Sequence, residues 1–257
     1  MKLRIWTLTL AVAAPLTAWC DDAPPPPPPP QHVWTGKGQA GFVASQGNSE
    51  GKSANVALDM TYQADPWKHL FHLAGLYGDS AGIVSAERWD TLWQSNYDLT
   101  KNLFTFVQLH YTRDMFSGFQ YQAAVSAGLG YKIFDTDALH LSLQAGAGYG
   151  ELRPETLIKD DTGAVVTRNL LPKEDSAIGT FGLNYAQNLT KTTTLTDKLQ
   201  VEYGSINTLA TNALALAVKI SNKLAMSVGY MIQYNTSPPA GLKKQDTNET
   251  INLVYSF

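Results

Sequence analysis

The sequence predicts an all-β protein, a closed antiparallel transmembrane β-barrel of about 12 strands. Three observations lead to this fold class. Apolar and polar residues alternate along most of the chain, short turns alternate with longer loops, and an apolar strand face continues to the last residue. Successive side chains of a strand point to opposite faces, so such alternation gives one apolar and one polar face. A wall between lipid and a polar lumen needs both faces.

Five segments carry the alternation most clearly. Each has apolar residues at most of its alternate positions, and the positions between them are mainly Ser, Thr, Asn, Gln, Gly or charged residues. About ten residues suffice for a tilted strand to cross a bilayer. Segment 69–78 is weaker, because both of its faces are mixed. The five segments are 53–63, 89–99, 121–132, 139–149 and 224–234.

The final segment has Ile251, Leu253, Tyr255 and Phe257 on one face. We expect it to pair with segment 34–45, because closing the sheet leaves no open edge in lipid. Its aromatic end also resembles the signal read by the outer-membrane barrel-assembly machinery, which would recognise it by strand addition. The plainer interpretation is a lipid-facing strand without a recognition role, and the two are compatible.

Aromatic residues gather toward the segment ends, as they do in the interfacial belts of membrane proteins. The members of this predicted belt are Tyr62, Trp67, Phe104, Tyr111, Tyr131, Tyr149, Tyr230 and Tyr234. Small residues on the opposite face suit a strongly curved wall with a crowded interior. These are Gly128, Gly146, Gly148 and Gly229.

The connections predict which end of the barrel is which. Short polar turns are expected in the periplasm and longer loops outside the cell, with both termini periplasmic. The short turns are 65–68, 100–102, 135–137, 190–192 and 221–223. The other connections are 47–51, 79–86, 115–119, 152–175, 205–210 and 235–245.

The N-terminus predicts export. Residues 1–18 have the basic start and apolar centre of a signal peptide. Residues 19–33 form a proline-rich periplasmic linker, and residues 34–257 form the barrel. The proline run, 24–30, is expected to be a stiff spacer, with a binding site for a proline-reading partner as the alternative. Cys20 suggests a lipoprotein, but Trp19 before it argues against acylation.

Composition excludes several classes of function. The net charge of −3 lacks the basic excess of a nucleic-acid-binding protein. Beyond the N-terminus no run of 18 apolar residues predicts a membrane helix. With five His and one Cys, no metal-ligand spacing occurs, and we expect neither metal nor cofactor. Segment 160–163 is a hairpin tip rather than a cation site. Lys243 and Lys244 could contact lipopolysaccharide phosphates, or form a solvated charge pair.

Ionisable residues on the polar face are candidate lumen charges. Charge in a narrow lumen must pair or meet water. These residues could form a selectivity ring of a pore, or a salt-bridged plug that only stabilises the barrel; neither sign dominates, which favours the plug. We expect no enzymatic activity, because no catalytic Ser–His motif is recognisable. The candidates are Asp59, Asp90, Asp98, His110, Asp114, Lys132, His140, Lys198, Glu202 and Lys219.

Several short motifs, in their order, resemble the YdiY-like salt-induced outer-membrane protein family, which carries a domain of unknown function. The resemblance covers residues 34–257. The motifs are Gly41 with 46–49, 111–114 with Gly118, 147–150, 235–239 and 255–257. The proline run departs from the family pattern.

This resemblance implies an outer-membrane β-barrel without an established activity. We expect a small passive channel or a structural envelope protein in the osmotic or salt response. The alternatives are a lipid-modifying enzyme and a translocator pore. The expected partners are outer-membrane lipid, lipopolysaccharide and, during biogenesis, the assembly machinery.

Overall fold

The computed structural model describes residues 33–45 and 51–257. The predicted signal peptide, Cys20, the proline run and residues 46–50 of the first loop lie outside this part of the chain. Within the described residues, no helix is long and apolar enough to cross a membrane.

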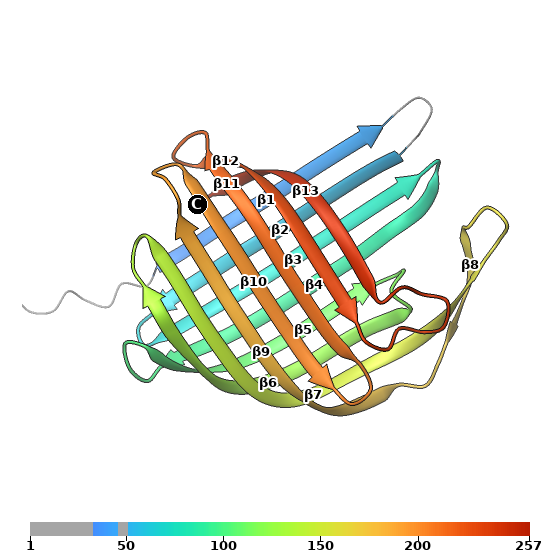
Figure 1. The fold of residues 1–257 in the computed structure, drawn as a ribbon, viewed down its shortest axis with the longest axis horizontal. Coiled ribbons are helices and arrows are strands. Elements are labelled where there is room, and N and C mark those ends of the chain that lie inside the picture. Colours follow the sequence, from blue (N-terminus) through green and yellow to red (C-terminus); the bar gives the residue numbers. More distant parts are fainter. Residues whose placement is uncertain (1–32, 46–50) are drawn as a thin grey trace, which may run out of the picture.

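All regular structure in the described ranges is β-strand, arranged in one antiparallel sheet (Figure 1). Twelve strands form the barrel wall, and β8 is a hairpin extension of β7. The strands are β1 (Val33–Ser45), β2 (Gly51–Ala64), β3 (Trp67–Ser80), β4 (Ile83–Asp98), β5 (Leu103–Asp114), β6 (Phe119–Asp135), β7 (Leu139–Lys159), β8 (Val165–Leu170), β9 (Glu174–Asn188), β10 (Thr193–Gly204), β11 (Thr208–Lys219), β12 (Leu224–Asn235) and β13 (Gln245–Ser256).

The sheet closes on itself. Each wall strand pairs with its neighbour in sequence, β7 pairs with β9, and β1 pairs with β13. The register of the closing pair runs from Lys37 opposite Ser256 to Ala40 opposite Leu253. The predicted pairing of segment 34–45 with the final strand is therefore confirmed, as is the closed barrel of about 12 strands.

Exposure separates the two faces of the wall. Along β5, Phe106, Gln108 and His110 are buried, whereas Val107 and Leu109 between them are 44% and 46% exposed. The same apolar exposure recurs on alternate residues of the other wall strands, while Gln, Asn, Ser and Thr dominate the buried face. An apolar outer face around a polar interior is the arrangement of a transmembrane barrel.

Connections differ at the two barrel ends. Val33 and Phe257 lie at the end with the short turns, since Phe257 pairs with Gly36. The other end carries the longest described connection, 236–244, and the β7–β8 hairpin, whereas the predicted loops 79–86 and 205–210 shorten to residues 81–82 and 205–207 between strands. Segment 152–175 differs from expectation, because it is largely strand: β7 continues to Lys159 and β8 returns beside it. Adjacent apolar residues such as Val165 and Val166 hide the alternation there.

Phe104 corrects one assignment to the aromatic belt. It is 4% exposed and lies on the inner face of β5, as does Phe106 at 1%. Both rings pack against inward-facing glycines, Phe104 on Gly130 and Phe106 on Gly146. A glycine wall leaves room for a large ring in a curved interior, and strand alternation alone does not reveal which face a terminal aromatic takes.

Gly128 provides a test of this close packing. A Cβ at this position would collide with the Ala145 carbonyl and the Cα of Gly146 on β7. We expect Gly128→Val to abolish most of the folded form, because backbone atoms cannot swing aside as a flexible side chain would. Heat-modifiable gel mobility after refolding into vesicles measures the folded fraction. Gly179→Val is the control, since no atom lies near its Cβ position; equal folding of both variants would contradict the packing argument.

Candidate functional site

The candidate site is a row of charged and titratable side chains inside the barrel. On the wall formed by β2 to β5, Asp59 lies opposite His72 in the strand register. The Nδ1 atom of His72 is 2.8 Å from a carboxylate oxygen of Asp59, and its Nε2 atom is 3.8 Å from Asp90. The other Asp90 oxygen lies 3.1 Å from Nε2 of His110. Four adjacent strands thus contribute alternating carboxylate and imidazole groups.

Two contacts carry this row across the lumen to β10. Nδ1 of His110 lies 2.6 Å from a Glu202 oxygen, and Nζ of Lys198 lies 3.7 Å from Asp59. We call the complete set the transverse chain. It runs through Lys198, Asp59, His72, Asp90, His110 and Glu202. The chain begins and ends on β10, so it spans the barrel interior rather than lining one wall.

Burial strengthens the electrostatic interactions in the middle of the transverse chain. The side chains of His110 and Glu202 are 8% and 10% exposed, and that of Asp90 is 16% exposed. Arg88 approaches Asp90 to 3.4 Å and adds a positive charge. Attraction between opposite charges is stronger in such a setting, and loss of one partner is correspondingly costly.

The contacts of His110 fix its chemistry. Both ring nitrogens face carboxylate oxygens, of Asp90 and of Glu202. A neutral imidazole has one N–H donor, whereas an imidazolium has two. Either His110 is an imidazolium or one of the two carboxyl groups holds the proton. No ring nitrogen of His110 is left to act as base toward a serine.

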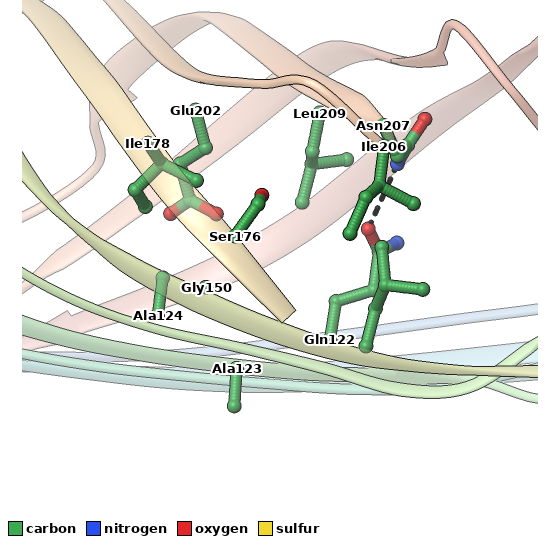
Figure 2. Close-up of a pocket in the computed structure, with 11 residues that line it drawn as sticks. Gln122, Ala123, Ala124, Gly150, Ser176, Ile178, Glu202, Ile206, Asn207 and Leu209 are labelled. Carbon is green, nitrogen blue, oxygen red and sulfur yellow. Dashed lines mark hydrogen bonds between the residues drawn. The ribbon is translucent and has the colours of Figure 1, made fainter. Parts of the chain in front are cut away.

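Amide bridges cross the lumen at two further levels. Gln94 of β4 donates to Gln144 of β7 over 2.9 Å. Toward the long loops, Asn207 in the β10–β11 connection donates to Gln122 over 3.0 Å and to Asn235 over 2.8 Å. Figure 2 shows the bond from Asn207 to Gln122 at one side of a cavity of about 30 Å³ that Glu202 also lines. That volume suits a few water molecules and no larger ligand.

Other buried polar atoms of the described lumen have no partner in the protein. They are Nε2 of Gln108 and Gln200, Oγ1 of Thr180, and both amide atoms of Gln233. A buried amide without a partner costs free energy unless a polar molecule meets it. The interior is thus suited to water or another small polar guest on either side of the transverse chain.

The predicted lumen charges fall into two groups. Asp59, Asp90, His110, Lys198 and Glu202 meet in the transverse chain. The others lie nearer the ends of the barrel. Lys132 pairs with Asp98 at 2.8 Å, His140 pairs with the exposed Asp135 at 2.8 Å, Asp114 accepts from the backbone of Phe116, and Lys219 is exposed at the end of β11.

Two members of the site escape sequence reasoning. His72 lies in the segment with mixed faces, so alternation does not assign it to the lumen. Arg88 comes just before the alternating segment that begins at Trp89. The signal for His72 is its place opposite Asp59, which depends on strand register and cannot be read from one strand.

Segment 160–163 forms the turn between β7 and β8. The Asp160 carboxylate accepts from the Thr162 hydroxyl at 2.6 Å, from the Thr162 backbone at 2.9 Å and from the Ala164 backbone at 3.0 Å. The hydrogen bond from the Thr162 side chain is the main cause that lowers the pKa of Asp160. Its acceptor capacity serves the turn, and within the described residues no cluster of His, Cys, Asp and Glu has the geometry for a metal ion.

Comparison with known proteins identifies the family. A family model described as "Protein of unknown function, DUF481" matches residues 38–257. The chain belongs to the DUF481 family. A curated relative from Escherichia coli (strain K12), described as "Uncharacterized protein YdiY", is 23% identical over 224 residues, which cover 85% of this chain and 81% of the relative. The predicted resemblance to YdiY-like proteins is confirmed.

Solved structures similar to this DUF481 protein include membrane barrels. An outer membrane channel from Pseudomonas putida F1 has a TM-score of 0.48 and 12% identity, covering 89% of this chain and 96% of the channel. The translocator domain of the autotransporter NalP from Neisseria meningitidis has a TM-score of 0.46 and 14% identity, covering 87% and 86%. The fold assignment rests on the strand pairing above rather than on these distant similarities.

The closed wall and apolar outer face make this DUF481 protein a transmembrane β-barrel of the outer-membrane type. Its passive channel or envelope function stays a prediction, as do its non-enzymatic character and its salt-dependent role. The four predicted assembly-signal residues are exposed on the outer face of the last strand. They are Ile251, Leu253, Tyr255 and Phe257.

Proposed function

We propose that this DUF481 protein is a narrow passive channel whose lumen is closed in the present conformation by the transverse chain. The observation that carries the proposal is the contact of β10 with the opposite wall at two points, His110 with Glu202 and Asp59 with Lys198. Partnerless amides above and below the chain favour a hydrated path over a dry, fully packed core. Separation of the two cross-lumen contacts would open that path to small hydrophilic solutes.

Weak ion selectivity is the expected consequence of the charge pattern. Single-sign rings of side chains produce strong selection between cations and anions. In the transverse chain three carboxylates alternate with Lys198 and two imidazoles, and Arg88 lies beside Asp90. Carboxylates and cations therefore face the same constriction, and small neutral solutes fit it as well as ions do.

The ion pair between Lys198 and Asp59 supports a proposed dependence of channel opening on salt concentration. Their side chains are 59% and 28% exposed, so dissolved ions can screen the attraction. The His110–Glu202 contact is buried and is screened much less. We propose that high ionic strength weakens the first contact and shifts the barrel toward opening, which would suit an envelope response to salt. In this proposal the short turns and both termini face the periplasm.

A structural envelope role is the second candidate. It is favoured by Phe104 and Phe106, whose rings fill part of the lumen on the side of the short turns. A lipid-modifying enzyme is less well supported, because His110 has both nitrogens engaged by carboxylates. A translocator pore would need a wider passage than the crossed lumen offers.

Single-channel recording in planar bilayers distinguishes the two candidates. We expect the wild type to open rarely and with small conductance, and Glu202→Gln to open several-fold more often, because it removes a cross-lumen charge. His140→Gln is the matched control: His140 also contacts a carboxylate, but at an exposed turn, and its recordings should equal those of the wild type. Silence of wild type and Glu202→Gln at low and high salt would reject the channel and favour the structural role.

A further inference from the structure

The seam between β1 and β13 is paired over only part of its length. Backbone pairing runs from Lys37–Ser256 to Ala40–Leu253, and Gly36 and Phe257 exchange two further bonds. On its other side β1 pairs with β2 along its whole length. Within the described residues, no pairing joins β1 and β13 beyond Ala40, and the two strands diverge there (Figure 1). Segments 41–45 and 245–252 therefore each have one unpaired edge.

These unpaired edges lie beside the apolar outer face of β12 and reach the level of Tyr230, a member of the predicted aromatic belt. In the strand register Glu249 is opposite Tyr230, and Thr247 is opposite Ile232, both on the outer face of β12. Tyr230 is 40% exposed, as expected of a residue that faces lipid. Backbone N–H and C=O groups in a bilayer need a partner, because lipid chains offer none. Something polar must meet this edge.

The outer face of β13 changes character shortly after the pairing with β1 ends. Leu253 and Tyr255 beside the paired stretch, and Ile251 just beyond it, are apolar and exposed. Beyond Ile251 the outward residues become polar, although their partners on β12 stay apolar. These polar residues are Gln245, Thr247 and Glu249, opposite Tyr234, Ile232 and Tyr230. A carboxylate facing lipid is destabilising, so this face borders a polar region within the belt.

The inner face of β1 becomes exposed beyond the last pair. Val43 is on the inward face of β1 beyond the last pair and is 54% exposed, whereas inward Val254 in the paired stretch is 7% exposed. At the point of divergence, Asn55 of β2 donates to Asn252 of β13 over 2.6 Å. The Asn55–Asn252 contact lies directly over Gly41 of β1, where a Cβ would collide with both asparagine side chains. The point where β1 and β13 separate is therefore lined by polar side chains on its inner side.

We propose that this open seam binds the polar head of an amphiphile and leaves its hydrocarbon chain in the bilayer. Amide, hydroxyl and backbone groups along β13 offer hydrogen bonds to the head. Glu249, on the outer face of β13, disfavours a phosphate or carboxylate there, so the head is uncharged or cationic. Phe42, which is 69% exposed on the outer face of β1, would contact the chain. The proposal does not depend on whether the lumen conducts solutes.

Chain-brominated probes test this site on the full-length protein. In a Cys20→Ser background, which removes the only cysteine, Thr250→Cys and Ala215→Cys are labelled with a small fluorophore. Both residues face the lumen and lie in one row with Gly229, but Ala215 is in a fully paired part of the wall. The labelled proteins, in phosphatidylcholine vesicles, are titrated with an alkyl maltoside or a phosphatidylglycerol, each brominated on its chain.

We expect the brominated maltoside to quench the label at position 250 several-fold more than the label at position 215, and the phosphatidylglycerol to quench both weakly. Glu249→Lys should shift the preference at position 250 toward phosphatidylglycerol. Equal quenching at the two positions would overturn the site, and stronger quenching by phosphatidylglycerol in the Thr250→Cys protein would overturn the head-group chemistry. Dimers that form at the labelled concentrations and exclude both probes would show that a second copy fills the seam instead.

Discussion

Glu202→Ala is expected to lower the free energy of unfolding by about 3–5 kcal/mol, the usual cost of removing one member of a buried charge pair. His110 would keep a 3.1 Å contact with Asp90 but lose the 2.6 Å contact across the lumen. Little solvent can reach the His110 side chain in exchange, since it is 8% exposed. Urea titration of the refolded barrel in lipid vesicles, followed by tryptophan fluorescence, measures the loss.

The exposed pair Asp135–His140 is a matched control. It has the same chemistry and a similar distance, 2.8 Å, but both side chains are more than half exposed. Asp135→Ala should therefore change the free energy of unfolding by less than about 1 kcal/mol. In addition, His110→Leu combined with Glu202→Leu should recover much of the lost stability, because apolar replacement of a whole buried pair is often neutral. Additive losses in the double variant would contradict a direct cross-lumen interaction.

Most of the fold can be predicted from the two-residue periodicity of the strands. Because side chains alternate between faces with a period of two, segments such as 53–63 and 224–234 reveal both their extended conformation and their lipid-facing side. The closing pair follows from the same logic, since an open edge in lipid leaves backbone groups unsatisfied. Periodicity fails at β8, where Val165 and Val166 are adjacent and the hairpin extends beyond the barrel wall.

The candidate site is less accessible to sequence reasoning. Alternation assigns Asp59, His110 and Glu202 to the lumen, and the structure brings all three into one chain. It does not indicate that Glu202 meets His110, because that contact depends on which strands face each other across the closed barrel. His72 shows the same limit at shorter range, since its position opposite Asp59 depends on register between two strands.

The short seam makes barrel closure sensitive to one residue, and Gly36→Val is expected to abolish the folded form. Gly36 N donates to the Phe257 carbonyl over 2.9 Å, and Phe257 N donates to the Gly36 carbonyl over 3.0 Å. The Phe257 ring covers Gly36 on the outer face, so a side chain there would collide with it. Each backbone group left unpaired in lipid costs several kcal/mol. Heat-modifiable gel mobility after refolding into vesicles reports closure.

Two further variants test whether the collision between residue 36 and the Phe257 ring prevents barrel closure. Gly38→Val, on the same face of β1 but with no atom near its Cβ position, should fold as the wild type does. Gly36→Val combined with Phe257→Ala should fold again in part, because the ring that obstructs valine is gone; failure of this double variant would show that the collision is not the cause.

Phe257→Ala alone should fold in vesicles, since the backbone pairing with Gly36 does not need the ring. If the assembly machinery recognises the aromatic residue, the same variant will reach the outer membrane of living cells at several-fold lower levels; unchanged levels would leave the ring with a packing role against Gly36 and Tyr255 only.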